Sequence, residues 1–503
     1  MYYICRAHDK SISTEPFLEI EHHEPLVLSP RLKSLQVGNE RLVLSPSNGG
    51  WCYLNSREWN VALSINGQGI NEFAQSLNLP ISLIERFVKL LVQRGILISP
   101  STRSDDYADR KKQNSRFILT FLLSNQCNLA CEYCYHAFSK QNKKGNITPF
   151  LANLALQYAF DQPTDELMID FGEIATSEKN FFQLLDDSKR LQEKKSKHTI
   201  YAIQTNGTTL TRKMASLLKQ NHIFVGLSLD GPADLHDQMR RYPAGMGSYS
   251  KANVGLENLI ELEIPFIVNA TIHRMNFQHL KKILDHFREM NILHFVFKPI
   301  LNRGNAVLAW EKIGLSFLEY HDFLCEMVAE AIDHRNLDCL DTTFITLLQR
   351  AMGDIRGWSS SCYSGFCQKD KAQLVVNADG FCYPCPRYSS IGKGRFCLGS
   401  IQSVALCNDA SMEMIETSRE TKSFLSPKCR NCLWVSYCGG GCPLEVDRAD
   451  EPNMCSITSK MYELIFSNII PKLRSGEFIR SNKLGDIQVV DEDFFNRDKW
   501  RKT

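Results

Sequence analysis

Three cysteines stand close together in the stretch SNQCNLACEYCYHAF, where Cys127, Cys131 and Cys134 follow a C-x3-C-x2-C spacing. Thiolates are soft ligands that suit zinc or iron–sulfur clusters. A structural zinc site usually takes four ligands, and C-x2-C pairs commonly supply them. His136 is the nearest residue that could complete such a site. A four-iron cluster held by three thiolates would instead leave one iron open to a small molecule, and that arrangement is useful only to an enzyme.

A second group of cysteines lies between residues 362 and 455 of this 503-residue chain, which has 18 cysteines in all. In CRNCLWVSYCGGGC, the spacing C-x2-C-x5-C-x3-C is made by Cys429, Cys432, Cys438 and Cys442. Upstream, a C-x12-G-x4-C pattern runs from Cys367 to Cys385. A secreted disulfide scaffold would be short and would carry a signal peptide, so clustered thiols here indicate metal binding or redox chemistry. A pair of zinc ribbons is the structural alternative.

Composition and charge exclude several classes of protein. The net charge of +2 gives no electrostatic footprint for nucleic acid or for an anionic membrane. The start MYYICRAHDK lacks a basic region followed by an apolar one, and the apolar run FILTFLL is far too short to cross a bilayer. We therefore expect a cytoplasmic protein with neither nucleic acid nor membrane as a partner.

Residues 116–300 contain the elements that would position the first three cysteines. Six short apolar runs alternate with amphipathic stretches, and we read them as strands: FILTFLL, LMIDF, TIYAIQT, IFVGLSL, PFIVNATI and HFVFKPI. Continuous apolar runs separated by helices indicate parallel strands buried on both faces. We therefore predict an α/β fold, a partial (β/α)6 TIM-like barrel, whose chemistry belongs at the C-terminal ends of the strands. The three cysteines follow the first run and so lie at that end.

The rest of the chain divides around this barrel. Near the N-terminus, the β-like runs PLVLS, RLVLS and WCYLN precede a helix capped by Ser56 and two further helical stretches, INEFAQSLN and ISLIERFVKLLVQRG. Small strands with three helices predict a winged-helix domain. The predicted segments are a winged helix at 1–99, a linker at 100–115, the barrel at 116–300, a helical bridge at 301–361, a cysteine-rich domain at 362–456, and a C-terminal helix and tail at 457–503.

The cysteine spacing after the first strand of a partial barrel resembles the radical S-adenosylmethionine (SAM) superfamily. The resemblance implies that Cys127, Cys131 and Cys134 hold a [4Fe-4S] cluster whose open iron chelates SAM. It also implies that an electron from an external donor, such as flavodoxin or ferredoxin, cleaves SAM to methionine and a 5′-deoxyadenosyl radical that abstracts hydrogen from the substrate. The cofactors supply the difficult chemistry, and the protein positions and shields it.

Other strand ends resemble further motifs of this superfamily. DFGE after the second strand is similar to the G-G-E motif, which implies that Glu173 holds the SAM amino group. Phe171 and Ile174 replace the usual glycine and proline, so the loop is expected to approach methionine differently. QTNG and SLDGP resemble the third- and fourth-strand signatures, which imply that Ser228 and Arg240 contact the SAM carboxylate or ribose. Each residue taken alone also has a structural interpretation. Glu173 could be a negative charge at the N-terminus of a helix, and Arg240 could be a solvated residue of a loop.

The C-terminal spacing resembles the SPASM extension of radical SAM enzymes that modify peptides and proteins. The resemblance implies two auxiliary [4Fe-4S] clusters, and so three in total. The first would be held by Cys362, Cys367, Cys385 and Cys442, and the second by Cys429, Cys432, Cys438 and Cys455. Cys382 and Cys397 compete with Cys362 as ligands, and without Cys362 the first cluster would have an open iron. We expect ordinary buried thiols at Cys5, Cys52, Cys325, Cys339 and Cys407.

The N-terminal segment resembles the recognition domain of ribosomal peptide maturases, related to the small peptide chaperone of pyrroloquinoline quinone biosynthesis. The resemblance implies that the leader of a precursor peptide adds a strand to the sheet edge and packs against the third helix. It rests on the order of elements and on the pattern GQGINEFAQSLNLPISLIERFVKLLVQRGIL.

Our leading hypothesis is therefore a peptide maturase that installs an intramolecular crosslink, either carbon–carbon or thioether; no residue is assigned as its general base. The alternative enzyme is an anaerobic sulfatase maturase, although Pro386 stands where those enzymes carry an aspartate after the cysteine matched by Cys385. A hypothesis from another class is an iron–sulfur redox sensor that binds DNA through the winged helix. The third helix of the winged-helix domain carries Arg86, Lys89 and Arg94, and three basic residues are few for binding DNA phosphates.

Overall fold

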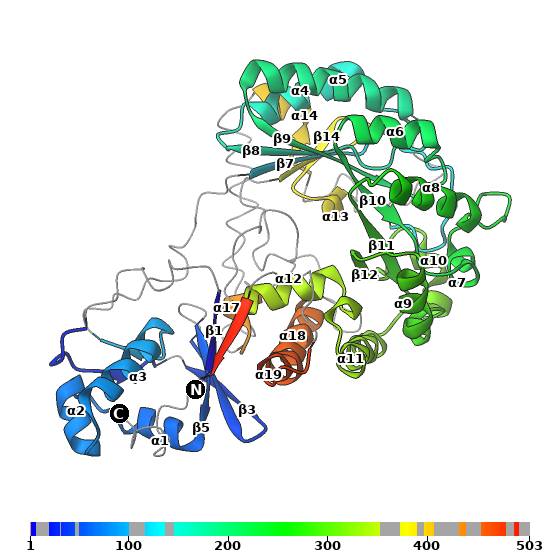
Figure 1. Ribbon diagram of the computed structural model, residues 1–503. Coiled ribbons are helices and arrows are strands. Elements are labelled where there is room, and N and C mark those ends of the chain that lie inside the picture. The colour runs from blue at the N-terminus through cyan, green and yellow to red at the C-terminus, as the bar shows by residue number, and fades with distance from the viewer. Residues whose placement is uncertain are drawn as a thin grey trace.

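The structure is a computed structural model of the whole chain with a mixed α/β fold (Figure 1). Its description covers residues 2–6, 20–30, 32–45, 50–99, 116–135, 145–352, 373–389, 397–406, 432–438, 454–478 and 487–491. Within these residues, no helix is both long enough and apolar enough to cross a membrane.

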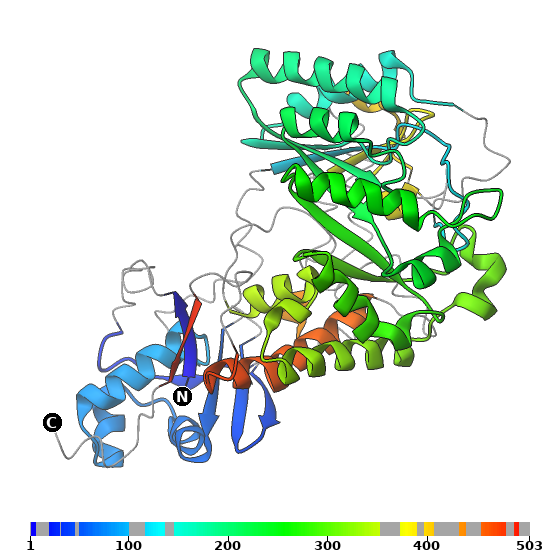
Figure 2. The same cartoon turned by 45° about the vertical axis from the view of Figure 1, so that its right-hand side comes forward.

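The six predicted strands form one parallel sheet in chain order, which confirms the partial barrel. The strands are β7 (Arg116–Phe121), β8 (Glu166–Asp170), β9 (His198–Thr205), β10 (Ile223–Ser228), β11 (Phe266–Ile272) and β12 (Phe295–Pro299). The connections are α4 (Pro149–Phe160), α5 (Glu178–Lys195), α6 (Arg212–Gln220), α7 (Ala233–Met239), α8 (Tyr249–Glu261), η1 (Phe277–His279) and α9 (Leu280–Glu289). These helices line the outer side of the curved sheet (Figures 1 and 2).

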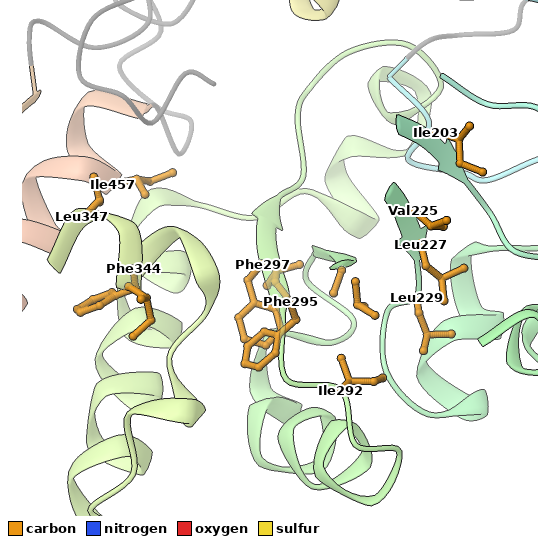
Figure 3. Close-up of a cluster of buried hydrophobic side chains, with 14 of the residues drawn as sticks. Ile203, Val225, Leu227, Leu229, Ile292, Phe295, Phe297, Phe344, Leu347 and Ile457 are labelled. Atoms are coloured by element: carbon orange, nitrogen blue, oxygen red, sulfur yellow. The ribbon is translucent and has the colours of Figure 1, made fainter. Parts of the chain in front are cut away.

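The main core lies between this sheet and its outer helices. Alternate residues of each strand point outward, because successive side chains of a strand face opposite sides of a sheet. On β12 the rings of Phe295 and Phe297 lie 5.1 Å apart, and Figure 3 shows them side by side on their strand. Val225 and Leu227 project from β10 in the same view and are fully buried. This alternation leaves the other face of every strand available to line the interior of the barrel.

The sheet continues beyond β7 into the cysteine-rich part of the chain, which the sequence did not predict. β13 (Gln373–Val376) pairs with β7 in parallel, and β14 (Phe381–Tyr383) and β15 (Gly399–Ser400) follow in antiparallel fashion, giving nine strands in all. Two short helices, α13 (Pro386–Ser389) and α14 (Ile401–Leu406), accompany them. The helix α14 contacts α4 on the outer side, whereas α13 lies on the inner side of the sheet (Figure 1).

The N-terminal part is a small sheet with three helices, as predicted, but its strands differ from the prediction. The antiparallel strands are β3 (Lys33–Val37), β4 (Glu40–Leu44) and β5 (Trp51–Asn55), and the helices are α1 (Ser56–Ser64), α2 (Ile70–Leu77) and α3 (Ile81–Gln93). The run PLVLS gives only β2 (Val27–Leu28), which pairs with β6 (Leu97–Ile98) instead. The residue that caps α1 is Asn55 rather than Ser56. The Asn55 side chain accepts the backbone N–H of Glu58, and the Glu58 side chain accepts the backbone N–H of Asn55, which makes a capping box.

Both ends of the chain join this N-terminal sheet. β1 (Tyr2–Arg6) and β16 (Ile487–Asp491) pair antiparallel over five residues, whereas β1 meets β5 at a single pair, Tyr2 with Tyr53. The sheet order is therefore β16-β1-β5-β4-β3. Residues 487–491 of the predicted C-terminal tail thus belong to the sheet of the predicted N-terminal domain.

The predicted bridge and closing helix are largely helical. They comprise α10 (Ala306–Ile313), α11 (Phe317–Asp333), η2 (Leu337–Cys339), α12 (Thr342–Ala351), α18 (Met454–Leu464), the π-helical η3 (Ile465–Ile469) and α19 (Ile470–Arg474). The short helix α17 (Val435–Cys438) lies in the predicted cysteine-rich domain, where α18 also begins. The helix α18 packs on α11 and α12, between the barrel and the N-terminal sheet (Figures 1 and 2).

Candidate active site at the mouth of the partial barrel

The loop after β7 carries Cys127, Cys131 and Cys134 to the C-terminal end of the sheet. Backbone bonds hold it against the loop after α7, where Ala130 N–H donates to Arg241 O at 2.7 Å. At Cys127, the Leu129 backbone N–H lies 3.4 Å from Sγ and the Asn206 amide 3.7 Å. Hydrogen bonds to cysteine sulfur stabilise a thiolate and tune the metal that it holds.

The three thiols lie near enough to act on one another electrostatically. Burial, with a smaller contribution from Cys134, raises the pKa of Cys127 to about 11 and that of Cys131 to about 12. Across the described residues, no group of three or more His, Cys, Asp or Glu has the compact geometry of a single-ion site. An iron–sulfur cluster binds each thiolate to a different iron, so its ligands need not converge on one point. Three thiolates are the donors that an iron–sulfur cluster takes, and binding one would release the thiol protons. His136, the alternative zinc ligand, lies outside the described residues.

Glu173 is held by its own loop and by the loop after β9. Its Oε1 accepts from Ala175 N–H at 2.9 Å and Thr205 Oγ1 at 3.2 Å, and its Oε2 accepts from Asn206 N–H at 2.8 Å. Burial raises the pKa of this carboxyl, and the hydrogen bonds oppose that rise. Asn206 thus contacts both Glu173 and Cys127, which places the predicted amino-group ligand beside the cysteine loop.

Ser228 belongs to a polar row that crosses the inner face of the sheet. The Gln204 amide donates to Ser228 Oγ at 3.3 Å, and the Asn269 amide donates to Gln204 Oε1 at 3.1 Å. These side chains cross over Gly226, where an added Cβ would lie 2.4 Å from Gln204 Oε1. Gly226 therefore leaves the room that the Gln204 side chain needs to reach Ser228.

Arg240 lies in a buried ion pair rather than in open solvent. Its Nε and Nη2 donate to the two oxygens of Asp230 at 3.0 and 3.2 Å, and Asp230 is fully buried. Thr271 N–H and the Tyr133 hydroxyl also donate to Asp230. Tyr133 lies between two of the cysteines, and the Arg240 guanidinium sits 5.2 Å from the centre of its ring. The pair therefore fixes the cysteine loop to the ends of β10 and β11.

The loop after β12 closes on the cysteines from the other side. Asn305 N–H donates to Cys134 O at 3.0 Å, and its side-chain amide donates to Cys131 O at 3.1 Å. Gly304 has φ +59°, and an added Cβ would lie 2.3 Å from Cys134 O. The first and last strands of the predicted barrel thus hold the same loop.

The auxiliary-cluster ligands are described only in part. Cys362, Cys367, Cys429 and Cys442 lie outside the described residues. On the inner side of the sheet, Cys385 packs against a small cluster that includes Val375, Tyr388 and Leu122. Among the residues predicted for the second cluster, Cys438 lies on α17 and Cys455 on α18, and these helices contact each other. Trp434 N–H donates to Cys432 Sγ at 3.4 Å.

The other cysteines are mostly buried. Cys52, Cys339 and Cys382 are buried, and burial raises the pKa of Cys52 and Cys382. Cys325 and Cys397 are half-buried. The side chain of Cys5 and the whole of Cys407 lie outside the description.

The comparison with protein families decides the identity of the domain that this site belongs to. Residues 121–287 match the Radical SAM superfamily. This part of the chain is a radical SAM domain. The match begins at the last residue of β7 and spans the cysteine loop and strands β8 to β11, and radical SAM domains use SAM and a [4Fe-4S] cluster.

Individual relatives of the chain include sulfatase-maturating enzymes. The cysteine-type anaerobic sulfatase-maturating enzyme of Clostridium novyi is 26% identical over 373 residues, which cover 70% of this chain and 94% of the relative. The serine-type enzyme of Bacteroides thetaiotaomicron is 26% identical over 63% of this chain and 80% of its own length. The structure of anSMEcpe with bound AdoMet has a TM-score of 0.59 and 24% identity, covering 71% of this chain and 98% of that one. The structural likeness is one of fold.

Four residues of the site escaped the sequence analysis. Tyr133 and Asp230 fall inside stretches quoted for their motifs, but their pairing joins positions 97 residues apart and only the fold brings them together. Gln204 and Asn206 lie within QTNG, and their polar character directly after an apolar run was the available signal.

Proposed function

We propose that this radical SAM enzyme modifies a ribosomally made precursor peptide and installs an intramolecular crosslink, either carbon–carbon or thioether. The observation that carries this proposal is the N-terminal sheet with three helices, which is joined to the catalytic domain through α18 and η3. A sheet edge beside helices suits binding of an extended leader segment by strand addition. The sulfatase-maturase relative of Clostridium novyi accounts for 70% of this chain, so a substantial part has no counterpart there.

The proposed roles follow the site. Cys127, Cys131 and Cys134 would hold the SAM-binding cluster, and Glu173, Ser228 and Arg240 would contact SAM directly or through their hydrogen-bond partners. When bound, this cofactor pair supplies a 5′-deoxyadenosyl radical for hydrogen abstraction. The protein's part is to fix the loop, exclude water and orient the peptide.

Two auxiliary [4Fe-4S] clusters belong to the same proposal. The ligands would be Cys362, Cys367, Cys385 and Cys442 for the first, and Cys429, Cys432, Cys438 and Cys455 for the second. The position of Cys385 on the inner side of the sheet supports a cluster close to the substrate. An external one-electron donor such as flavodoxin or ferredoxin would reduce the SAM-binding cluster.

A second candidate function is sulfatase maturation, which the sulfatase-maturating relatives favour. The structure of anSMEcpe solved with a Kp18Cys peptide also supports a peptide as the class of substrate. Both candidates begin with hydrogen abstraction from a peptide and differ in the product. The hypothesis of a DNA-binding sensor without catalysis is set aside because the chain is an enzyme.

The deciding experiment is anaerobic incubation of the reconstituted enzyme with SAM, a reductant and two sets of peptides. One set contains leader-bearing precursor peptides encoded beside the gene, and the other contains the Kp18Cys peptide. Tandem mass spectrometry should find a precursor that has lost two hydrogens and shows a gap in its fragment series. Conversion of Kp18Cys alone, with every precursor unmodified, would replace the first function with the second. The C127A/C131A/C134A variant is the control and should form no 5′-deoxyadenosine.

A further inference from the structure

Asp170 is an acidic residue at the mouth of the barrel with one carboxyl oxygen left for a ligand. It ends β8, where Leu167 and Ile169 are fully buried under the outer helices, so its side chain alternates to the inner face. Its Oδ1 accepts Gly172 N–H at 2.9 Å, and within the described part of the chain no donor reaches its Oδ2. Glu173, three residues on, is the proposed ligand of the SAM amino group.

The turn that follows fixes the direction of this carboxyl. Gly172 has φ +61°, and an added Cβ would lie 2.4 Å from Phe121 O at the end of β7. Only glycine adopts this conformation in so little space. Its N–H can therefore reach back to Asp170 Oδ1, which leaves Oδ2 as the oxygen that can accept a proton on the inner face of the sheet.

At the opposite end of β8, the acidic residue Glu166 has a structural role and is paired with side chains of the neighbouring strands. Glu166 is paired with Arg116 on β7 and lies 3.1 Å from His198 Nδ1 on β9. These three residues are direct neighbours in the sheet register. The charge at the N-terminal end of β8 is thus matched by adjacent strands, whereas Asp170 at the C-terminal end has no such partner on β7 or β9.

Across the inner face, one cation acts on Asp170. Lys298 on β12 is exposed and lies on the face opposite Phe297, which packs outward. Burial raises the pKa of Asp170 to about 6, and Lys298 and the Gly172 hydrogen bond restrain that rise. The carboxylate is therefore ionised at neutral pH, yet basic enough to accept a proton.

A crosslinking reaction needs a group of this kind. Hydrogen abstraction leaves a carbon radical on the peptide, and its bond to an aromatic ring leaves one ring carbon with a surplus hydrogen. Breaking that C–H bond restores the closed-shell product with the loss of one proton and one electron. The electron can pass to a one-electron acceptor of the iron–sulfur class, and the proton requires a base within hydrogen-bond reach.

We propose that Asp170 is the general base of the reaction, accepting the proton of the broken C–H bond on its free Oδ2. This role rests on the proposed function, because it assumes that a peptide radical forms on the inner face of the sheet. Proton acceptance would come after hydrogen abstraction, so loss of the base should leave abstraction intact.

The test compares wild type, Asp170→Asn and Glu166→Gln with the peptide that the wild-type enzyme modifies in the screen above, deuterated at the abstracted position. For Asp170→Asn we expect product formation to fall by ~10²–10⁴-fold, the usual contribution of a general base. Deuterium transfer into 5′-deoxyadenosine should stay within about threefold of wild type. Asp170→Glu should recover part of the product, and Glu166→Gln should form product at nearly the wild-type rate.

Binding and folding are measured on the same proteins. Fluorescence anisotropy with the labelled peptide should show similar affinity for wild type and Asp170→Asn. Calorimetry above pH 6 should show an unchanged or higher Tm for Asp170→Asn, because the variant no longer buries an ionised carboxylate. A misfolded variant would instead lose Tm, affinity and deuterium transfer together, and Asp170→Glu would then carry the test.

Three results would overturn the base role. They are wild-type product formation by Asp170→Asn, an equal loss of product in Glu166→Gln, and a loss of deuterium transfer with a normal Tm, which would make Asp170 a binding residue. Failure of the proposed function itself looks different, because wild type would then modify none of the precursor peptides.

Discussion

Two aspartates at the mouth of the barrel have pKa values shifted in opposite directions because their partners differ. Asp170 has a distant cation and one hydrogen bond, so burial raises its pKa to about 6. Asp230 is fully buried, but the Arg240 guanidinium holds its pKa below the usual range. The same carboxyl group can therefore exchange a proton in Asp170, whereas in Asp230 it stays charged and holds a loop in place.

The first prediction at the residue scale concerns pH. If Asp170 must be ionised, product formation should fall about tenfold for each pH unit below about 6. Lys298→Met removes the charge that favours the carboxylate, so the acidic limb should move to higher pH. The measurement is single-turnover product formation between pH 5 and pH 8. Lys282→Met, which breaks an exposed pair with Asp234, is the matched control and should leave the limb in place.

The second prediction concerns the Asp230–Arg240 pair. Asp230→Asn leaves a buried guanidinium without its counter-ion, which typically costs ~3–5 kcal/mol. Asp234→Asn breaks an ion pair whose side chains are about half exposed, and such pairs contribute ~0–1 kcal/mol. Calorimetry should therefore show a large fall in Tm for the first variant and a small one for the second. Similar losses in both would show that the buried pair does not stabilise the barrel.

At the scale of elements, the barrel was predictable because its strands are continuous apolar runs at regular spacing. β3 was missed although KSLQV has the alternation of a half-buried strand, because a run of five residues with only two apolar side chains gives a weak signal. β14 and β15 are too short to leave a pattern, and β1 and β16 pair across almost the whole chain. The cysteines and Glu173 were read from spacing, whereas the contacts of Asp170, Asp230 and Lys298 depend on which strands become neighbours.

A glycine pair tests whether the loop after β12 supports the cysteine loop. Gly304→Ala would bring a Cβ against Cys134 O, whereas Gly245→Ala, at φ +88°, meets nothing within 4 Å. Both alanines carry the same kind of backbone strain, about 1 kcal/mol or more. Only Gly304→Ala should therefore lower the iron bound per chain and the yield of 5′-deoxyadenosine after anaerobic reconstitution. Equal iron content in the two variants would contradict the proposed support.

At the scale of the whole molecule, one aromatic cluster joins the N-terminal sheet to the rest of the enzyme. The Phe466 ring lies 5.3 Å from Trp51 of β5 in an edge-on contact and 5.3 Å from Trp434, on which it stacks. Trp51 Nε1–H donates to Ala351 O at 2.5 Å, and the Tyr53 hydroxyl donates to Phe466 O. The sheet proposed to bind the leader, the bridge helix α12 and the cysteine-rich region thus meet at two residues in contact, Trp51 and Phe466.

This junction predicts a separation of binding from catalysis. Trp51→Ala removes a buried indole and leaves a cavity, which typically lowers the free energy of unfolding by ~3–5 kcal/mol. Because Trp51 is 3% exposed and lies at the junction, the contacts that it loses are those of the junction. SAM cleavage without peptide should continue, since the cysteine loop is held by β10, β11 and the loop after β12. Modification of a leader-bearing precursor should fall at least tenfold, whereas a leaderless core peptide should be modified equally by both proteins.

The matched control for this prediction is Trp59→Ala, which removes a partly buried indole from beneath Arg41 within the N-terminal unit itself. Trp59→Ala should lower the stability of the N-terminal unit and should not change the rate of limited proteolysis between that unit and the barrel. Trp51→Ala should by contrast speed cleavage in the segment 100–115. If Trp51→Ala slows SAM cleavage as much as it slows modification of the leader-bearing precursor, the junction supports the catalytic domain itself. The N-terminal unit would then not act as a separate holder for the leader.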